Sequence, residues 1–167
     1  MSLYIEPDKL KELAQSHYKE HQDLVKRLRK KKPGDLDDLV HEMDAELFED
    51  IDCLECGNCC KSLGPRVTDK DISRLSKQLK LKDSEVVEQY LRMDEDGDYV
   101  FSEMPCPFLM SDNYCMVYEK RPKACRDYPH THQTRFQNHL KISLLNTFTC
   151  PVVYHIFRKL SGIYLRA

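Results

Sequence analysis

Half of the chain's eight cysteines fall within one stretch of eight residues, C-L-E-C-G-N-C-C. The full set is Cys53, Cys56, Cys59, Cys60, Cys106, Cys115, Cys125 and Cys150. Cysteine thiolates bind metals, hold iron–sulfur clusters, attack substrates or pair in disulfides. The spacing of the sulfurs and the setting of the chain favour some of these chemistries over others.

The two-residue spacing in this stretch favours a metal. Cysteines two residues apart in a tight turn can bring two sulfurs to one ion. Gly57 lets the backbone curl, so that amide N–H groups point at sulfur. This knuckle suits zinc, but three cysteines at C-x-x-C-x-x-C with a distant cysteine before proline also suit a four-iron cluster. Both Cys106 and Cys150 precede a proline.

The adjacent Cys59 and Cys60 are the unusual feature, because neighbouring side chains diverge and do not easily share one tetrahedral ion. One of them can face the metal while the other serves a second metal or acts as a redox or nucleophilic thiol. Eight sulfurs also divide evenly into two sites of four ligands. The sequence leaves open which cysteines belong together.

The apolar runs and the net charge of the chain indicate its cellular compartment. The N-terminal segment carries Glu6 and Asp8 and has no apolar run typical of a signal peptide, and no run of about 18 apolar residues occurs anywhere. We therefore expect a cytoplasmic protein without a membrane segment, in which thiols stay reduced and disulfides are disfavoured. A net charge of -2 argues against bulk attraction to nucleic acid.

Two amphipathic helices are predicted at the start of the chain, over residues 7–32 and 35–51, separated by Pro33 and Gly34. We expect them to form an antiparallel hairpin. Residues 26–32 are almost all basic, whereas residues 35–55 hold ten acids and no lysine or arginine. The predicted organisation is a helical hairpin over residues 1–50 and a cysteine-rich domain over residues 51–167.

Short elements are predicted for the cysteine-rich part. Thr68 and Asp71 nearly form a capping box for a helix, and a second helix is expected over residues 83–93. Short strands are expected at Y-V-F, F-L-M and C-M-V-Y, and a brief helix is expected after Arg121-Pro122. Residues 133–148 are ambiguous, and a last helix should run from Pro151 to Gly162. The predicted fold class is α+β, mainly helical, with an irregular domain organised by metal.

Other motifs are weak. H-Y-K-E-H, from His17 to His21, matches a zinc-peptidase pattern, but such matches arise easily in a helix rich in charge. The loop D-E-D-G-D-Y lacks the glycine and carboxylate positions of a calcium loop and is interpreted as a turn. The five glycines form no nucleotide-binding fingerprint.

The spaced cysteine motifs together resemble a known family. C-L-E-C-G-N-C-C, C-P-F-L, C-M-V-Y-E-K-R-P-K-A-C-R-D-Y-P and C-P follow one another over about 100 residues, in the order found in the YkgJ-type cysteine-cluster proteins. These are described as zinc- or iron-chelating domains and include the flagellin lysine N-methylases. The resemblance implies that the cysteines chelate zinc or iron, including a four-iron (4Fe–4S) cluster, and leaves enzymatic activity open.

Arg121 and Arg126 lie within the segment that carries the resemblance. Basic residues beside a thiolate-rich site would offset the negative charge of a cluster or bind an anionic substrate. The structural alternative is that Arg126 pairs with an acid while Pro122 begins a helix. The sequence does not decide between these roles.

Three classes of function remain. The first is a metal- or cluster-binding protein whose centre is structural, redox-active or used in metal handling. The second is an iron–sulfur-assisted enzyme resembling a protein lysine methyltransferase, which the missing glycine-rich cofactor loop disfavours. The third is a zinc-stabilised adaptor that contacts a protein partner through its charged N-terminal hairpin.

Overall fold

Helix α10 (Pro151–Tyr164) is built from an apolar segment and organises the helical part of the molecule. Pro151 occupies its first turn, where the missing N–H costs no hydrogen bond, and its preset φ favours helix initiation. Side chains one helical turn apart are buried on α10, among them Val153, Phe157 and Leu160. Helix α10 passes Gly162 and ends at Tyr164, so the predicted end at Gly162 was wrong. Burial of Ser161 and Tyr164 outweighs the low helix propensity of the glycine.

The computed structural model describes residues 2–166, which separate into two compact units. Unit 1 comprises residues 1–56 and 129–167, and unit 2 comprises residues 57–128. This division joins the C-terminal segment to the N-terminal helices, whereas the sequence predicted a division at residue 50. The C-x-x-C-x-x-C-C stretch crosses the boundary between the two units.

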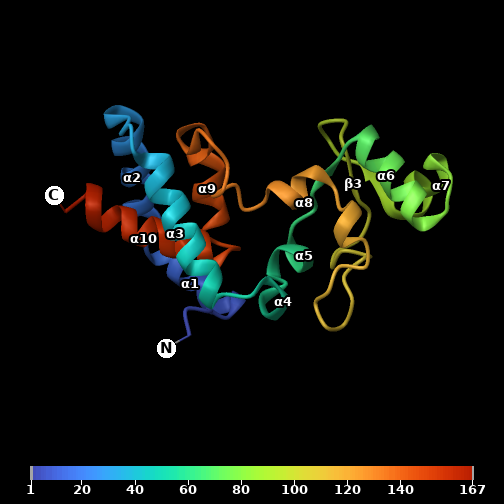
Figure 1. Cartoon of the computed structure of the whole chain (residues 1–167), viewed down its shortest axis with the longest axis horizontal. Coiled ribbons are helices and arrows are strands. Elements are labelled where there is room, and N and C mark those ends of the chain that lie inside the picture. Colours follow the sequence, from blue (N-terminus) through green and yellow to red (C-terminus); the bar gives the residue numbers. More distant parts are fainter. Residues whose placement is uncertain (1, 167) are drawn as a thin grey trace. The chain divides into compact units, whose positions relative to one another are not determined.

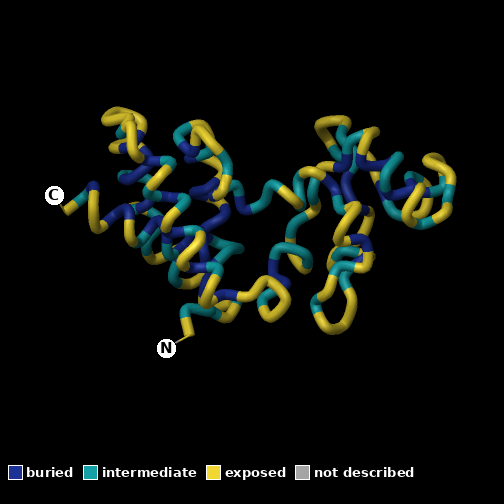
Figure 2. The backbone as a smooth tube through the Cα atoms, in the orientation of Figure 1, coloured by how far each residue is buried: buried dark blue, intermediate teal, exposed yellow. Residues whose placement is uncertain are grey.

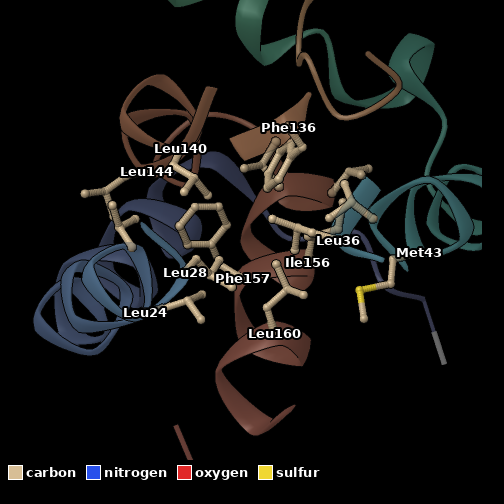
Figure 3. Close-up of a cluster of buried hydrophobic side chains, with 14 of the residues drawn as sticks. Leu24, Leu28, Leu36, Met43, Phe136, Leu140, Leu144, Ile156, Phe157 and Leu160 are labelled. Atoms are coloured by element: carbon tan, nitrogen blue, oxygen red, sulfur yellow. The ribbon is translucent and has the colours of Figure 1, made fainter. Parts of the chain in front are cut away.

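Unit 1 is helical. Its elements are α1 (Pro7–Ser16), α2 (Tyr18–Lys31), α3 (Leu36–Asp50), α4 (Cys53–Cys56), the 3-10 helix η2 (Phe136–His139), α9 (Leu140–Asn146) and α10. Helices α2 and α3 both pack against α10 (Figure 1). Their inward sides, with those of η2 and α9, bury one apolar core around Phe136, Leu140 and Phe157 (Figure 3). The predicted hairpin helices therefore exist, and α10 completes their core.

The helix predicted over residues 7–32 is interrupted at His17, which has φ -99° and ψ 3°. The Nδ1 atom of His17 lies 3.0 Å from the Leu13 carbonyl oxygen and 3.0 Å from the Tyr154 hydroxyl oxygen. These contacts hold the His17 side chain at the junction between α1 and α2. The apolar periodicity could not show this break, because it depends on Tyr154 of α10.

Unit 2 combines short helices with a small sheet. Its elements are α5 (Asn58–Ser62), β1 (Arg66–Val67), α6 (Asp69–Leu79), α7 (Asp83–Tyr90), β2 (Leu91–Met93), β3 (Tyr99–Phe101), the 3-10 helix η1 (Tyr118–Lys120) and α8 (Lys123–Asp127). The strands are antiparallel in the order β1-β3-β2. The predicted mainly helical α+β class is confirmed.

Two details of unit 2 differ from the prediction. Helix α7 ends at Tyr90, and residues 91–93 pair with β3 instead of extending the helix. The predicted strands at F-L-M and C-M-V-Y are reduced to one antiparallel bridge between Leu109 and Cys115, after which η1 begins. Pro107 has no N–H to donate to a ladder, and local turns use the neighbouring amides.

A second apolar core lies in unit 2. It joins Leu75 of α6 and Val86 of α7 with Phe101, Phe108 and Val117. Cys106 and Cys115 pack against this core as partly buried residues. In Figure 2 the buried positions of unit 2 follow α6, α7 and the strands, whereas several loops of the unit are exposed.

Candidate metal centre

Four cysteines of unit 2, here called the four-thiol set, lie near enough for their charges to act on one another: Cys60, Cys106, Cys115 and Cys125. The Cys106 amide donates to the Cys60 carbonyl oxygen at 2.8 Å, which joins the end of the cysteine-rich stretch to the C-P-F-L turn. The Leu109–Cys115 bridge and a 2.8 Å bond from the Met116 amide to the Phe108 carbonyl then place Cys115 beside the same turn.

Backbone amides act on two thiols of this set. The amides of Phe108 and Leu109 act to lower the pKa of Cys106, and the amide of Val117 acts to lower the pKa of Cys115. Donors aimed at sulfur favour the charged thiolate over the neutral thiol. The C-P-F-L sequence forms a tight turn, because Pro107 follows the cysteine and the Leu109 amide donates to the Cys106 carbonyl oxygen at 3.0 Å. The metal-binding knuckle that the sequence predicted at Gly57 stays a prediction.

Burial opposes ionisation of these thiols. Burial raises the pKa of Cys106 to about 11, with the charges of Cys60 and Cys115 adding to the effect, and it also raises the pKa of Cys115. Burial raises the pKa of Cys125 to about 12, and the neighbouring thiols of the set raise it further. Without a cation nearby, these sulfurs therefore stay neutral at pH 7. A bound metal ion would supply the positive charge that ionises them.

Cys60 differs from the rest of its set. A hydrogen bond from the Cys59 thiol lowers the pKa of Cys60 to about 7, and the positive charges of Arg121 and Lys61 act in the same direction against burial. Cys60 is therefore the most easily ionised member of the four-thiol set. The adjacent cysteines of the sequence are thus joined by a hydrogen bond between their thiols.

Three cysteines of unit 1, here called the three-thiol set, belong to two segments: Cys53, Cys56 and Cys150. Cys53 and Cys56 are the first and last residues of α4, so their side chains are one helical turn apart. Cys150 is the N-cap of α10, where its side chain makes no capping hydrogen bond, although the nearby amides of Val152 and Val153 act to lower the pKa of its thiol. Burial raises the pKa of Cys150 to about 12, and the charges of Cys53 and Cys56 raise it further.

The two arginines that the sequence singled out have different surroundings. The Arg121 guanidinium stacks 3.9 Å from the centre of the Tyr118 ring and donates to the Tyr118 carbonyl oxygen at 2.7 Å. Its charge acts on Cys60, Cys115 and Cys125, which places it beside the four-thiol set. Arg126 is exposed on α8.

Asp71 supports the site, although sequence reasoning identified it only as part of a helix cap. Its buried carboxylate accepts from the Thr68 amide at 2.9 Å, from the Lys123 amide at 3.1 Å and from the Arg74 guanidinium. Burial raises the pKa of Asp71, but these bonds and the Arg74 charge outweigh burial and hold the pKa below its usual value. Asp71 thereby anchors the first residue of α8, the helix that carries Cys125.

Gly57 supports the turn between α4 and α5. Its φ is +54°, a conformation that glycine adopts without strain. A Cβ atom at this position would lie 2.9 Å from the Asn113 side chain, so the glycine is also required for close packing. The sequence indicated the special backbone at Gly57, but the contact with Asn113 spans more than fifty residues and could not be predicted.

The potential metal ligands do not form a preformed metal site among the described residues. Within residues 2–166, no three His, Cys, Asp or Glu side chains are gathered closely enough to hold an ion. All eight cysteines are present as thiols. The chemistry of the two sets nevertheless fits zinc or an iron–sulfur cluster, because both sets consist of soft sulfur donors. Binding would require the sulfurs of a set to turn toward the ion.

The comparison with protein families agrees with this chemistry. The family model "CxxCxxCC: Putative zinc- or iron-chelating domain" matches residues 52–144, more than half of the chain. The chain belongs to this CxxCxxCC family. The matched range includes every cysteine except Cys150, and it runs from unit 1 into unit 2 and back.

A curated relative shares part of the chain. The uncharacterized protein MJ0661 of Methanocaldococcus jannaschii is 34% identical over 86 residues, which cover 50% of this chain and 46% of that protein. The chain therefore spans about half the length of this relative. No solved structure matches the chain.

A second surface feature of unit 1 lies away from the cysteines. A surface hollow of about 350 Å³ in unit 1 is lined by basic residues of α2 and by the end of α10: Arg27, Lys30, Lys31, Ile163 and Tyr164. The Lys31 ammonium lies 5.3 Å from the centre of the Tyr164 ring. Between residues 2 and 166 no helix has the length and apolar character needed to cross a membrane. The predicted protein partner of the N-terminal helices stays a prediction.

Proposed function

We propose that this CxxCxxCC protein binds zinc or an iron–sulfur cluster through the thiolates of its cysteine sets. The observation that carries the proposal is the joining of Cys60, Cys106 and Cys115 by the main chain, through the 2.8 Å bond from the Cys106 amide to the Cys60 carbonyl oxygen and through the Leu109–Cys115 bridge. These contacts bring cysteines from separate segments of the chain near one another, and the thiolate is the form of cysteine that binds metal. The membership of the chain in a zinc- or iron-chelating family supports the same conclusion.

In unit 2 the metal would have a structural role. The segment between β3 and the end of the unit contains only one β-bridge, η1 and α8 as regular structure. Cys106 and Cys115 lie at the edge of its apolar core. A metal held by the four-thiol set would tie three distant segments together, so that the free energy of metal binding would contribute to folding.

The chain's own residues prepare this site in three ways. The amides of Phe108, Leu109 and Val117 act to lower the pKa of the neighbouring thiols, and the Arg121 charge would offset the negative charge of the thiolates. Asp71 holds the start of α8 in place. Zinc would supply a closed tetrahedral centre, and an iron–sulfur cluster would supply a one-electron redox group.

The test is anaerobic purification followed by measurement of zinc, iron and labile sulfide per chain, with a visible spectrum. Bound zinc without colour identifies a zinc centre, and iron with sulfide and broad absorption identifies a cluster. We expect chelation of the metal to lower the melting temperature. A chain that holds neither zinc nor iron, and whose melting temperature is unchanged by chelators, would refute the proposal.

A further inference from the structure

We propose that the surface hollow where the end of α2 meets the end of α10, here called the basic hollow, binds a small molecule that carries a phosphate monoester on an apolar or aromatic body. Its lining residues are Arg27, Lys30, Lys31, Ile163 and Tyr164. The hollow has a volume of about 350 Å³, which is in the range of small-molecule sites. No cysteine lines it, so the inference does not depend on the metal proposed for the thiols.

Three cations converge on the basic hollow because of the helix period. Arg27, Lys30 and Lys31 occupy positions i, i+3 and i+4 of α2, which lie on one face of a helix. All three residues are exposed. The Lys31 ammonium lies 5.3 Å from the centre of the Tyr164 ring, and this contact holds one of the cations against the wall of the hollow. The hollow therefore presents charged donors, the groups that bind phosphate oxygens most strongly.

The positive charge at this end of α2 exceeds what the helix itself needs. Residues 26–32 contain six basic residues and no acid. The negative end of a helix dipole amounts to about half an elementary charge, so a single cation would complement it. Like charges one helical turn apart also repel one another and destabilise a helix. Helix stability alone therefore does not account for this cluster.

The acids of the chain do not neutralise the cations of the basic hollow. Within residues 2–166, the basic segment 26–32 takes part in one ion pair, between Lys26 and Asp23 at 3.4 Å, and Lys26 does not line the hollow. Asp35 is close, because its charge adds to burial in raising the pKa of Tyr164, but it forms no ion pair among the described residues. The charge of the hollow is thus available to a ligand.

The lining selects a phosphate ester among anions. A phosphate monoester carries about two negative charges at neutral pH and three acceptor oxygens, so it can contact more than one cation at once. Arg27 can hold two of these oxygens as a fork, and Lys30 adds a point charge. Ile163 is 42% exposed, and an apolar body on the ester would cover it. The net charge of -2 disfavours a long polyanion such as nucleic acid.

Isothermal titration calorimetry of the full-length chain with phenyl phosphate tests the proposal at pH 8, where this ester is a dianion. Phenyl phosphate should bind about tenfold more tightly than inorganic phosphate, because its ring covers Ile163. Phenol, which has the ring without the charge, should not bind. Ile163→Ser should remove the advantage of phenyl phosphate over inorganic phosphate. Zinc and iron are counted in the same samples before and after titration, so that removal of metal by the probe is detected.

A matched pair of double variants separates the basic hollow from the charge of the helix end. Arg27→Gln with Lys30→Gln should weaken the binding of phenyl phosphate by about tenfold, because it removes two charged donors. Lys26→Gln with Arg29→Gln removes the same charge from the same helix end but leaves the lining intact, so it should weaken binding by less than about threefold.

A third variant should act in the opposite direction. Asp35→Asn should strengthen the binding of phenyl phosphate by about two- to threefold, because it removes a negative charge near Tyr164. Every position substituted in these tests is exposed, so the variants should fold as the wild type does.

The outcomes are distinct. Binding that is lost in the hollow variant and kept in its matched control would support the proposal. Equal losses in the two double variants would overturn it, because the attraction would then come from the whole helix end. Absence of phenyl phosphate binding would also overturn it, including the case in which an RNA oligonucleotide alone binds. A chain that binds phenyl phosphate but holds neither zinc nor iron would refute the proposed function and leave this inference intact.

Discussion

The buried histidine at position 21 gives the sharpest quantitative prediction. His21 of α2 has 0% of its surface exposed, and neither ring nitrogen has a hydrogen-bond partner among residues 2–166. The rings of Phe157, Tyr154 and His17 surround it at centre distances of 5.3, 5.8 and 6.0 Å. Burial lowers the pKa of His21 from 6.5 to about 4, and the charges of Arg158 and His17 lower it further while Glu20 opposes them.

The sign of the pH effect follows from this lowered pKa. Below pH 6.5 the unfolded chain binds a proton at His21, whereas the folded chain does so only near pH 4. The unfolded state therefore binds more protons in this window, and stability falls as the pH falls. Between pH 8 and pH 5 the loss attributable to His21 amounts to about 2 kcal/mol.

The perturbation is His21→Leu, which fills the site without a titrating group. Urea unfolding at pH 8 and pH 5 should show the variant gaining about 2 kcal/mol relative to the wild type as the pH falls. At pH 8 the variant should be at least as stable, because it removes two unpaired polar atoms. Loss of metal at low pH affects both proteins equally and cancels in the difference.

The matched control is His132→Leu, because His132 is exposed and has no burial cost to relieve. Its stability should follow the wild type at both pH values. The titration of the His21 ring by NMR gives a direct second measurement and should show a midpoint near pH 4. The reasoning is refuted if the stability difference between wild type and His21→Leu is the same at pH 8 and pH 5.

Three further predictions concern the support of the four-thiol set. Asp71→Ala should lower the free energy of unfolding by about 2–4 kcal/mol, because it leaves the Thr68 and Lys123 amides and Arg74 without their acceptor. The exposed control Asp69→Ala should lower it by under about 1 kcal/mol, and equal losses for the two variants in urea unfolding would contradict this reasoning. Gly57→Ala should lower the free energy of unfolding by about 1–2 kcal/mol because of its positive φ, and by more because of the contact with Asn113. Gly97 also has a positive φ but has open space around it, so the melting temperature of Gly57→Ala should be lower than that of Gly97→Ala. Equal melting temperatures would show that the Asn113 contact is unimportant. Arg121→Gln should weaken metal retention against a competing chelator by roughly tenfold, because the Arg121 charge acts on the thiols. The control Lys120→Gln should retain metal as the wild type does. Equal retention in the two variants would exclude a role for Arg121 at the thiolates.

Local patterns predicted the elements with strong signals of their own. The capping box of Thr68 and Asp71 begins α6, the apolar spacing over residues 35–51 forms α3, and proline begins α10. These signals act within one or two turns of chain, so the sequence shows them directly. The mainly helical α+β class followed from them.

The elements that were wrong depend on distant residues. The break at His17 involves Tyr154, and β2 forms because residues 91–93 find a partner in β3. The expected strands around Cys106 and Cys115 became turns, because Pro107 has no N–H for a ladder and the Leu109 amide donates to the nearby Cys106 carbonyl oxygen. Packing and pairing across the chain outweighed local propensity in each case.

The sequence by itself determined the chemistry of this protein: eight soft sulfur donors in an order that places the chain in a zinc- or iron-chelating family. It could not determine which sulfurs are neighbours, because cysteines that are close in the chain can belong to different cores. Only the tertiary structure separates Cys56 from Cys60 by a unit boundary and gives them Cys150 and Cys106 as neighbours. The physical reason is that burial, main-chain pairing and amide donors act through space, and folding alone brings those groups together.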